Sequence, residues 1–326
     1  MKKIRWGIVG PGFIANKFAD ALSNVDDAVL FAVSSTNVSK AEDFARIHNI
    51  PKVFETYEQM AISDEIDAVY ISTIHPFHKP SAEIFIKNKK HVLCEKPLCV
   101  NANEARKLQS LAKENNVFLM EAMWTAFLPA IECAKKLVSD GVIGEVKSTR
   151  ASFCYRMEPS EDPKLFDNSL AGGSLLDVGV YGLYFSSLFS KGKPECISSV
   201  SRVENGVDLQ MEVLLRYPSN VLSLVSSAID LEKEEDAVIY GTEGMITIPH
   251  FYRADTLYVK KGDSQKCIEK PFLGNGFEEE IIHFTECVNN NLSQSPIHPL
   301  EKSIEILEIM DEIRKNDGII YADSDN

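Results

Sequence analysis

Hydrophobic and polar positions in the first third of the chain alternate between two patterns. Short apolar runs, which are typical of buried strands, are separated by runs with helical spacing. The predicted strands span residues 4–9, 28–34, 53–54, 68–73, 91–94 and 117–121. The predicted helices span residues 14–22, 39–48, 80–88 and 101–115, with a short one beginning at Thr56 and a capping box expected at Ser39. Strands joined by helices of this length imply a parallel sheet in an α/β nucleotide-binding domain, residues 1–122.

The rest of the chain shows more strand-like alternation. A helix over residues 130–140 and a strand over 145–155 precede an apolar helix over 175–189. Further strands, without helices between them, are predicted over residues 197–203, 209–217, 221–229, 237–240, 245–248 and 256–260. Successive strands without crossovers indicate a mainly antiparallel sheet, and two terminal helices complete a second α/β domain, residues 123–326. These helices are predicted over residues 277–290 and 299–315, and only the polar tail after Tyr321 is expected to be irregular.

The first predicted strand leads into a glycine-rich turn, Gly-Pro-Gly-Phe-Ile-Ala at residues 10–15. Gly10 permits the tight turn, and Gly12 lets the backbone approach a pyrophosphate. The following helix begins near Phe13 and Ile14, and its free N–H groups favour phosphates. A strand, a turn and a helix in this order predict a nicotinamide or flavin dinucleotide site, the alternative being a glycine-rich turn without a ligand.

Composition and charge narrow the class of protein. The 326 residues are 44% hydrophobic and 25% charged, which is ordinary for a globular protein with one or two cores. A formal net charge of −14 argues against a nucleic-acid or anionic-membrane partner, and no apolar run has the length of a membrane span. Seven cysteines without paired spacing predict reduced thiols in a cytoplasmic protein. Because the chain opens on a charged strand, no signal peptide is expected.

The residues after the second predicted strand indicate whether the chain binds NAD or NADP. Enzymes that use NAD usually place an acid here to hold the ribose hydroxyls. This chain instead has Ser-Ser-Thr-Asn at residues 34–37. Ser35, Thr36 and the nearby Lys40 are candidates to bind a 2′-phosphate, which favours NADP, with NAD as the alternative cofactor. The same residues are also typical of a plain turn.

Two further strand ends carry ionisable side chains. Thr73 ends the fourth strand, and His75 and His78 follow it without a third ligand at suitable spacing. No metal is therefore expected, and ordinary loop histidines are the alternative. The fifth strand ends in Glu-Lys-Pro at residues 95–97. Lys96 suits an anionic or carbonyl-like ligand in the crevice, although a salt-bridged strand end also fits this residue alone.

These motifs in their order resemble the glucose–fructose oxidoreductase/inositol dehydrogenase/MocA family over nearly the whole chain. The resemblance rests on residues 10–15, 95–97 and 241–244, and residues 75–78, 120–125 and 172–181 resemble the dihydrodiol dehydrogenase branch. It implies a Rossmann domain and a second α/β domain whose open sheet forms a homodimer or higher homo-oligomer, with the last helix packing back toward the first domain. It also implies an NAD(P)-dependent dehydrogenase that acts on CH–OH or CH–CH groups and transfers a hydride between the nicotinamide and a hydroxyl or carbonyl of a small polyol, sugar or cyclic diol.

Residue roles in the first domain follow from the resemblance position by position. Lys96 matches the family's catalytic lysine, which contacts the reacting oxygen and the cofactor. Glu95 and Pro97 shape its turn, and the Lys96–Pro97 bond is expected to be cis as in relatives. His78 matches a position near the nicotinamide, so both a cofactor-binding and a catalytic role are expected for it.

A second pair of matched residues lies on the apolar helix. Asp177 and Tyr181 stand where many members carry Asp-x-x-x-His, and their spacing of four predicts one helical face. We expect Tyr181 to exchange the hydroxyl proton, with the Lys96 ammonium beside it lowering the pKa of the phenol and Asp177 orienting the pair. Because a phenol is a weaker acid than an imidazolium, alcohol oxidation should be fastest at alkaline pH. A polar turn and a core aromatic are the alternative.

The expected substrate contacts are aromatic. Trp124, Phe153, Tyr252 and Phe277 lie where branch members place aromatic side chains over the substrate, although such residues also commonly fill a core. Ala126 stands where relatives often have arginine, so one guanidinium contact to cofactor or substrate is expected to be lost.

Two other functions fit the dinucleotide motif by itself. A non-catalytic NAD(P)-binding sensor of the same family is one, and the intact Lys96, Asp177 and Tyr181 argue against it. A flavin enzyme is the other, and no further motif supports it.

Overall fold

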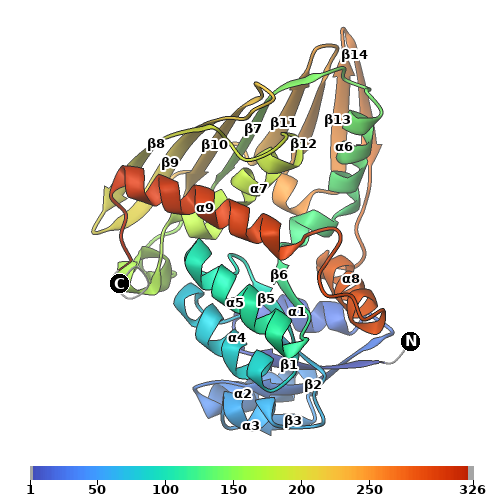
Figure 1. The fold of residues 1–326 in the computed structure, drawn as a ribbon, viewed down its shortest axis with the longest axis vertical. Helices are drawn as coiled ribbons and strands as arrows, with labels where there is room; N and C mark the ends of the chain where they lie inside the picture. Colours follow the sequence, from blue (N-terminus) through green and yellow to red (C-terminus); the bar gives the residue numbers. More distant parts are fainter. Residues whose placement is uncertain (1–2, 322–326) are drawn as a thin grey trace. The chain divides into compact units, whose positions relative to one another are not determined.

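Two compact units make up the chain in the computed structural model, which describes residues 3–321 (Figure 1). The first unit comprises the chain up to Phe127 together with Phe272–Ile304. The second comprises Leu128–Pro271 and the residues from Glu305 onward. The first unit therefore includes a C-terminal segment, which a boundary near residue 122 assigns to the second domain. The polar tail expected after Tyr321 lies outside the described residues.

A parallel sheet of six strands forms the centre of the first unit. In spatial order its strands are β3 (Lys52–Phe54), β2 (Ala28–Ser34), β1 (Ile4–Val9), β4 (Ala68–Ile71), β5 (His91–Glu95) and β6 (Leu119–Ala122). Both faces are covered by helices, so the central strands are apolar along their length, and every residue of β4 is buried. The strand order reverses between β1 and β4, which is where sheets of this kind bind their ligands.

Helices connect these strands as the sequence predicts. They are α1 (Phe13–Leu22), α2 (Val38–His48), α3 (Tyr57–Ala61), α4 (His78–Lys87) and α5 (Ala102–Asn115), with the short turns η1 (His75–Phe77) and η2 (Trp124–Phe127). α8 (Phe277–Asn289), from the C-terminal segment, belongs to the same core. Its Phe284 ring lies 4.8 Å from that of Trp6 and 5.0 Å from that of Phe118. This aromatic contact explains why α8 packs with the parallel sheet.

The second unit contains a mixed sheet of eight strands. In spatial order they are β14 (Ser264–Glu269), β13 (Thr256–Lys261), β12 (Met245–Pro249), β11 (Asp236–Gly241), β7 (Val146–Cys154), β10 (Leu222–Ala228), β9 (Val207–Arg216) and β8 (Cys196–Glu204). β7 and β10 pair in parallel, and all other neighbours pair antiparallel. The predicted α/β class with a mainly antiparallel second sheet is therefore confirmed.

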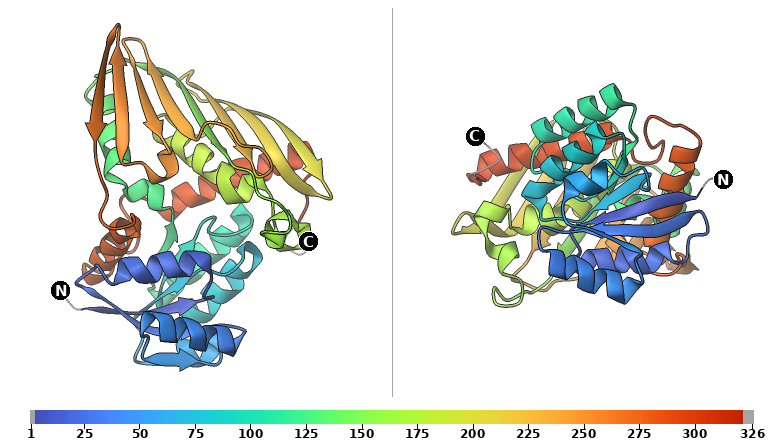
Figure 2. Two further views of the ribbon diagram at one scale, coloured as in Figure 1. Left: turned by 180° about the vertical axis from the view of Figure 1, so that it is seen from behind. Right: turned by 90° about the horizontal axis from the view of Figure 1, so that it is seen from below.

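One helix, α7 (Val180–Leu188), packs against β7 and β10 on one face of this sheet (Figure 2). A Cβ at Gly182 would stand 2.5 Å from Cγ1 of Val225, so the glycine permits this close contact. The other helical segments of the unit are α6 (Pro129–Ser139), η3 (Pro163–Phe166), η4 (Asn168–Leu170), η5 (Leu175–Gly179) and η6 (Phe251–Arg253). α9 (Leu300–Asp317) begins in the first unit and ends in the second. Among residues 3–321, no helix is both long and apolar enough to cross a membrane.

The structure corrects three local predictions. The edge strand β14 was missed because it pairs only with β13 and its side chains are largely exposed and polar, which removes the hydrophobic alternation. α2 is capped by Asn37, whose side chain accepts from the Lys40 N–H at 3.3 Å, and not by Ser39. The apolar helix begins with a π-helical turn, η5, ahead of α7.

Candidate active site

The glycine-rich turn lies at the carboxyl end of β1, beside the reversal of strand order. Gly10 has φ of 85°, a conformation that favours glycine. A Cβ there would stand 2.9 Å from Cγ2 and 3.2 Å from Cα of Thr73. The turn is also held by the Gly10 N–H, which donates to Ser34 O at 3.1 Å. Gly10 is therefore required by the backbone itself.

The space beside Gly12 is open and suits an anionic group. Gly12 is the N-cap of α1, and a Cβ there would meet only the carbonyl oxygen of Gly10, at 4.0 Å. The first turn, which contains Phe13 and Ile14, has no acidic residue, and Phe13 is 81% exposed. Lys17 places its Nζ 5.8 Å from the centre of the Phe13 ring. Exposed N–H groups at a helix start with a nearby ammonium fit a pyrophosphate.

The loop after β2 is a hydrogen-bonded turn with an exposed rim. The Ser35 hydroxyl is buried and accepts from the Asn37 N–H at 3.1 Å, whereas Thr36 and Lys40 are exposed. The half-buried Tyr57 hydroxyl interacts with the backbone of Thr36, and burial raises its pKa. The loop presents hydroxyls and an ammonium and no carboxylate, which suits a phosphate ester. The sequence analysis missed Tyr57 as a neighbour of this loop, because the residue belongs to no cofactor-binding motif.

His78 joins the loops that follow β4 and β5. The ring is 1% exposed, with Nδ1 2.8 Å from Pro97 O and Nε2 3.0 Å from Thr73 O. Burial lowers the pKa of His78, and the two carbonyl oxygens oppose this shift. Both ring nitrogens therefore face backbone oxygens. The Thr73 hydroxyl is buried and has no hydrogen-bond partner within residues 3–321.

Lys96 is half-buried on a turn that follows β5, and its bond to Pro97 is cis, as predicted. Glu95 accepts from the Lys96 N–H at 3.1 Å through Oε2 and from the Tyr70 hydroxyl through Oε1. Burial raises the pKa of Glu95 to about 6 although these bonds oppose the shift. Glu280 on α8 is fully buried, and burial together with the Glu95 charge raises its pKa well above the usual range. The turn thus places an ammonium beside a densely hydrogen-bonded carboxylate.

The second unit carries the other two predicted polar residues on consecutive helical segments. Asp177 lies on η5, and Tyr181 lies in the first turn of α7. Oδ2 of Asp177 accepts from the Tyr155 hydroxyl at 2.6 Å, and burial followed by the Asp177 charge raises the pKa of that phenol. Asp208, on β9, accepts from the Leu175 N–H at 2.6 Å and so holds the start of η5. Sequence reasoning missed both Tyr155 and Asp208, because neither belongs to a contiguous motif.

Aromatic side chains surround Asp177 and Tyr181 within the second unit. Phe153 and Tyr252 stack at 3.8 Å with 12° between their planes. The Tyr181 ring lies 5.7 Å from Phe153 and 6.1 Å from Tyr252. The structure therefore brings two of the four predicted substrate aromatics together with Tyr181. The other two, Trp124 and Phe277, pack against each other in the first unit, 4.7 Å apart.

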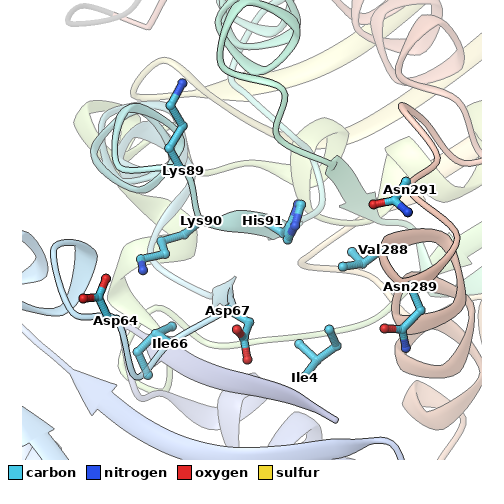
Figure 3. A pocket seen from close by; sticks show the side chains of 10 residues that line it. All are labelled: Ile4, Asp64, Ile66, Asp67, Lys89, Lys90, His91, Val288, Asn289 and Asn291. Atoms are coloured by element: carbon cyan, nitrogen blue, oxygen red, sulfur yellow. The ribbon is translucent and has the colours of Figure 1, made fainter. Parts of the chain in front are cut away.

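A cavity in the first unit lies at the amino ends of the strands and is unsuited to the dinucleotide. It has a volume of about 400 Å³, and its lining includes Ile4, Asp67 and His91 (Figure 3). Ligands bind parallel sheets at the carboxyl ends, which are the opposite ends of β1, β4 and β5. Lys90, in its lining, donates to Ser63 O at 2.6 Å. Across the described part of the chain, no group of three or more His, Cys, Asp or Glu side chains is arranged to hold a metal ion.

Sequence comparisons assign the chain to a family. The model for the oxidoreductase family with an NAD-binding Rossmann fold matches residues 4–123, and the GFO/IDH/MocA C-terminal domain model matches residues 131–247. Trans-1,2-dihydrobenzene-1,2-diol dehydrogenase of Mus musculus is 38% identical over 98% of this chain and 98% of its own length. The Homo sapiens enzyme of the same name is 35% identical, with 98% of each chain covered.

Solved structures share the fold over almost the full length. An aldose-aldose oxidoreductase from Caulobacter crescentus, in complex with glycerol, superposes with a TM-score of 0.88 at 22% identity and covers 97% of each chain. A 3-ketoreductase from Actinomadura kijaniata, in complex with NADP and TDP-benzene, gives 0.87 at 24% identity and covers 97% of this chain and 98% of its own. The chain therefore belongs to the GFO/IDH/MocA oxidoreductase family and is an NAD(P)-dependent oxidoreductase.

Proposed function

We propose that this enzyme interconverts a hydroxyl and a carbonyl group on a small polyol, sugar or cyclic diol, with Lys96 and Tyr181 acting on the same oxygen. Two observations, one from each unit, carry the proposal. The second unit sets Tyr181 beside aromatic side chains, one helical segment after Asp177. The first unit has a lysine-bearing turn at the ligand end of its parallel sheet. The relatives named dihydrodiol dehydrogenase support an alcohol as the reacting group.

Each residue has a defined task in the proposed reaction. When bound, the nicotinamide ring supplies the site that accepts or returns the hydride. Tyr181 takes the proton of the substrate hydroxyl during oxidation and returns it during reduction. The Lys96 ammonium stabilises the negative charge that develops on that oxygen, and Asp177 orients the phenol. His78, whose two nitrogens face Pro97 O and Thr73 O, acts by holding the two cofactor loops together.

NADP is the proposed cofactor. Ser35, Thr36 and Lys40 offer N–H, hydroxyl and ammonium donors around the loop after β2, with no carboxylate to repel a 2′-phosphate. The pyrophosphate would bind at the exposed start of α1, where the space beside Gly12 is open. The preference is measured as the ratio of kcat/KM for NADP and NAD, which we expect to exceed ten, and Lys40→Ala should reduce this ratio.

A substrate with a flat or ring-shaped face is proposed from the aromatic lining. The stacked pair Phe153 and Tyr252 presents ring surface beside Tyr181, and rings pack well against the faces of sugars and cyclic diols. The Tyr252 hydroxyl donates to Glu235 at 2.9 Å, which fixes the orientation of its ring. Trp124 and Phe277 are proposed to complete the substrate contacts.

An absorbance screen for reduced nicotinamide tests the proposal. Diols, aldoses and inositols are offered with NADP or NAD, and we expect turnover with at least one of them that is fastest at alkaline pH. Tyr181→Phe and Lys96→Met should each lower kcat by about 10²–10⁴ at saturating cofactor. Near-normal turnover in both variants would show the assignment to be wrong. Dinucleotide binding without turnover on any substrate would instead favour a sensor of the same family.

The proposed assembly is a homodimer formed through the open face of the eight-stranded sheet. β8, β9 and β10 expose Val200, Leu214, Leu222 and Leu224 on the face away from α7, with Leu214 directly opposite Leu224. Leu214, Leu222 and Leu224 adjoin one another on this face, and adjoining exposed apolar side chains are typical of a protein interface. A second copy of the chain would cover this face, in keeping with the sheet interface that the family resemblance implies.

A reducing compartment, such as the cytoplasm, is the proposed location. None of the seven cysteines, all of which lie in the described part of the chain, forms a disulfide. Four of them are buried, and burial raises the pKa of the Cys94 and Cys99 thiols, which keeps them protonated.

A further inference from the structure

The turn that carries Lys96 is attached to a buried carboxylate with no role assigned above. Glu121 lies on β6, beside β5, and is fully enclosed. Its Oε1 accepts from the N–H of Leu98, two residues after Lys96, at 2.8 Å. Its Oε2 accepts from the Ser303 hydroxyl at 2.6 Å and lies 2.8 Å from Nε2 of His298. One carboxylate therefore connects the turn with a segment about two hundred residues later in the chain.

The charge of Glu121 is well compensated in this position. Burial acts to raise its pKa, but hydrogen bonds from His298, Ser303 and the Leu98 N–H outweigh burial and lower it. The side chain is therefore an anion at neutral pH. Hydrogen bonds to a buried anion are short and directional, so they fix the donor groups more firmly than neutral bonds do.

The contacts of Glu121 continue into the C-terminal segment of the same unit. His298 Nε2 lies 3.1 Å from the Ser303 hydroxyl, and the His298 N–H donates to the Ser295 hydroxyl at 2.9 Å. Ser295 in turn lies 2.7 Å from Nε2 of His283 on α8. The turn after β5 is thus supported by α8, by the residues that lead into α9 and by the first turn of α9.

We propose that Glu121 is a positioning residue for Lys96, acting through Leu98, and that His298 and Ser303 hold Glu121 in place for this task. The inference rests on the proposed function, because it takes Lys96 to be the group that contacts the reacting oxygen. A displacement of about 1 Å in a reacting group can lower a rate by about 10²-fold. The ammonium sits on a long flexible side chain, so the direction of its backbone decides where it reaches.

Three substitutions and one control test this role. Glu121→Met removes the acceptor at similar volume, Glu121→Gln retains an amide oxygen for Leu98, and Ser303→Ala removes a single donor. The control is Ser223→Ala, which deletes an equally buried serine hydroxyl that accepts from Thr149 at 2.7 Å in the other unit. Hydrogen–deuterium exchange of the peptide containing residues 95–99 is measured beside kcat, the KM for the cofactor and the melting temperature.

Glu121→Met should speed exchange at the turn and lower kcat, each by about 10- to 100-fold, while the KM for the cofactor changes less than about threefold. In Glu121→Gln, the exchange rate and kcat should both return most of the way to the wild-type values. Ser303→Ala should show smaller changes of the same kind in both quantities. Ser223→Ala should change neither quantity. Exchange that stays at the wild-type rate in Glu121→Met and Ser303→Ala would overturn the proposal. So would faster exchange with unchanged kcat in an active enzyme. If the wild type turns over no substrate, the proposed function fails, and the exchange rates still report whether Glu121 holds the turn.

Discussion

At the scale of single residues, the glycines of the first turn separate backbone requirements from ligand requirements. Gly10 has positive φ and contacts Thr73, whereas Gly12 has φ of −130° and open space around its Cβ position. The first glycine is therefore needed by the fold, and we propose that the second is needed by the ligand. Both positions belong to one contiguous motif, which is why the sequence predicts them, and Lys96 is predictable for the same reason.

Alanine at these two positions should give different defects. Gly10→Ala should lower the free energy of unfolding by about 1–3 kcal/mol, because it forces a Cβ into Thr73 with an unfavourable φ. Gly12→Ala should leave stability nearly unchanged but weaken dinucleotide binding by at least about tenfold, or about 1.4 kcal/mol. Chemical denaturation and a fluorescence titration with NADPH measure the two effects. Equal stability losses in both variants would contradict the distinction.

Tyr155 shows what the sequence cannot supply at this scale. Its hydroxyl donates to Asp177, yet no motif links the two positions, and only the packing of β7 beside η5 brings them together. The same holds for Glu121 and His298, which lie 177 residues apart in the chain. Contacts of this kind are fixed by tertiary structure and leave no local pattern.

Tyr155→Phe should impair Asp177 without affecting cofactor binding. Loss of a hydrogen bond to a charged group costs about 1.5–3 kcal/mol, so kcat should fall by about 10- to 100-fold. The KM for NADP should not change, because Tyr155 belongs to the second unit and the dinucleotide motif to the first. Steady-state kinetics with both substrates varied decide the matter, and a raised KM for NADP with normal kcat would count against the role.

At the scale of elements, the segment from η5 to α7 carries both Asp177 and Tyr181, and a buried acid fixes its start. Asp208 accepts from the Leu175 N–H and, at 3.0 Å, from the Ser174 hydroxyl. The hydrophobic pattern predicts a helix over this region. It does not predict the π-helical turn, because that geometry depends on hydrogen bonds to a strand 33 residues away.

The stability of this element should depend on pH in a defined direction. Burial raises the pKa of Asp208 to about 6 from 3.8, so the folded state binds its proton more readily than the unfolded state does. The contribution of Asp208 to the free energy of unfolding should therefore decrease by about 3 kcal/mol as pH rises from about 4 to about 7. Asp208→Asn should remove that part of the pH dependence, and the exposed Asp26→Asn should not. Parallel denaturation curves for Asp208→Asn and wild type across this range would contradict the account.

At the scale of the whole molecule, the groups of the proposed active site are distributed over both units. The first presents a dinucleotide motif and a lysine on a supported turn, and the second presents a phenol, a carboxylate and aromatic surface. The sequence predicts the order of strands and helices in both units well, because buried strands and amphipathic helices have distinct periodicities. The return of α8 to the first unit is not predicted by periodicity, since it depends on which apolar surface Phe284 meets.

The open sheet provides a prediction about assembly. Leu214 is 48% exposed among other apolar residues of β8 to β10, and Leu214→Arg should convert the proposed dimer to a monomer. Ile62→Arg, at a 71% exposed position of the first unit, is the matched control and should leave the assembly unchanged. Sedimentation equilibrium gives the molar mass of each variant, and a wild type with the mass of one chain would refute the sheet interface.

The most direct test of the central claim is a crystal structure of the enzyme with NADP and a bound diol. We predict that Lys96 Nζ and Tyr181 Oη both lie within about 3.5 Å of one substrate oxygen, and that the carbon bearing it faces C4 of the nicotinamide. A complex in which that oxygen contacts neither group, or in which the two groups point to different sites, would contradict the account.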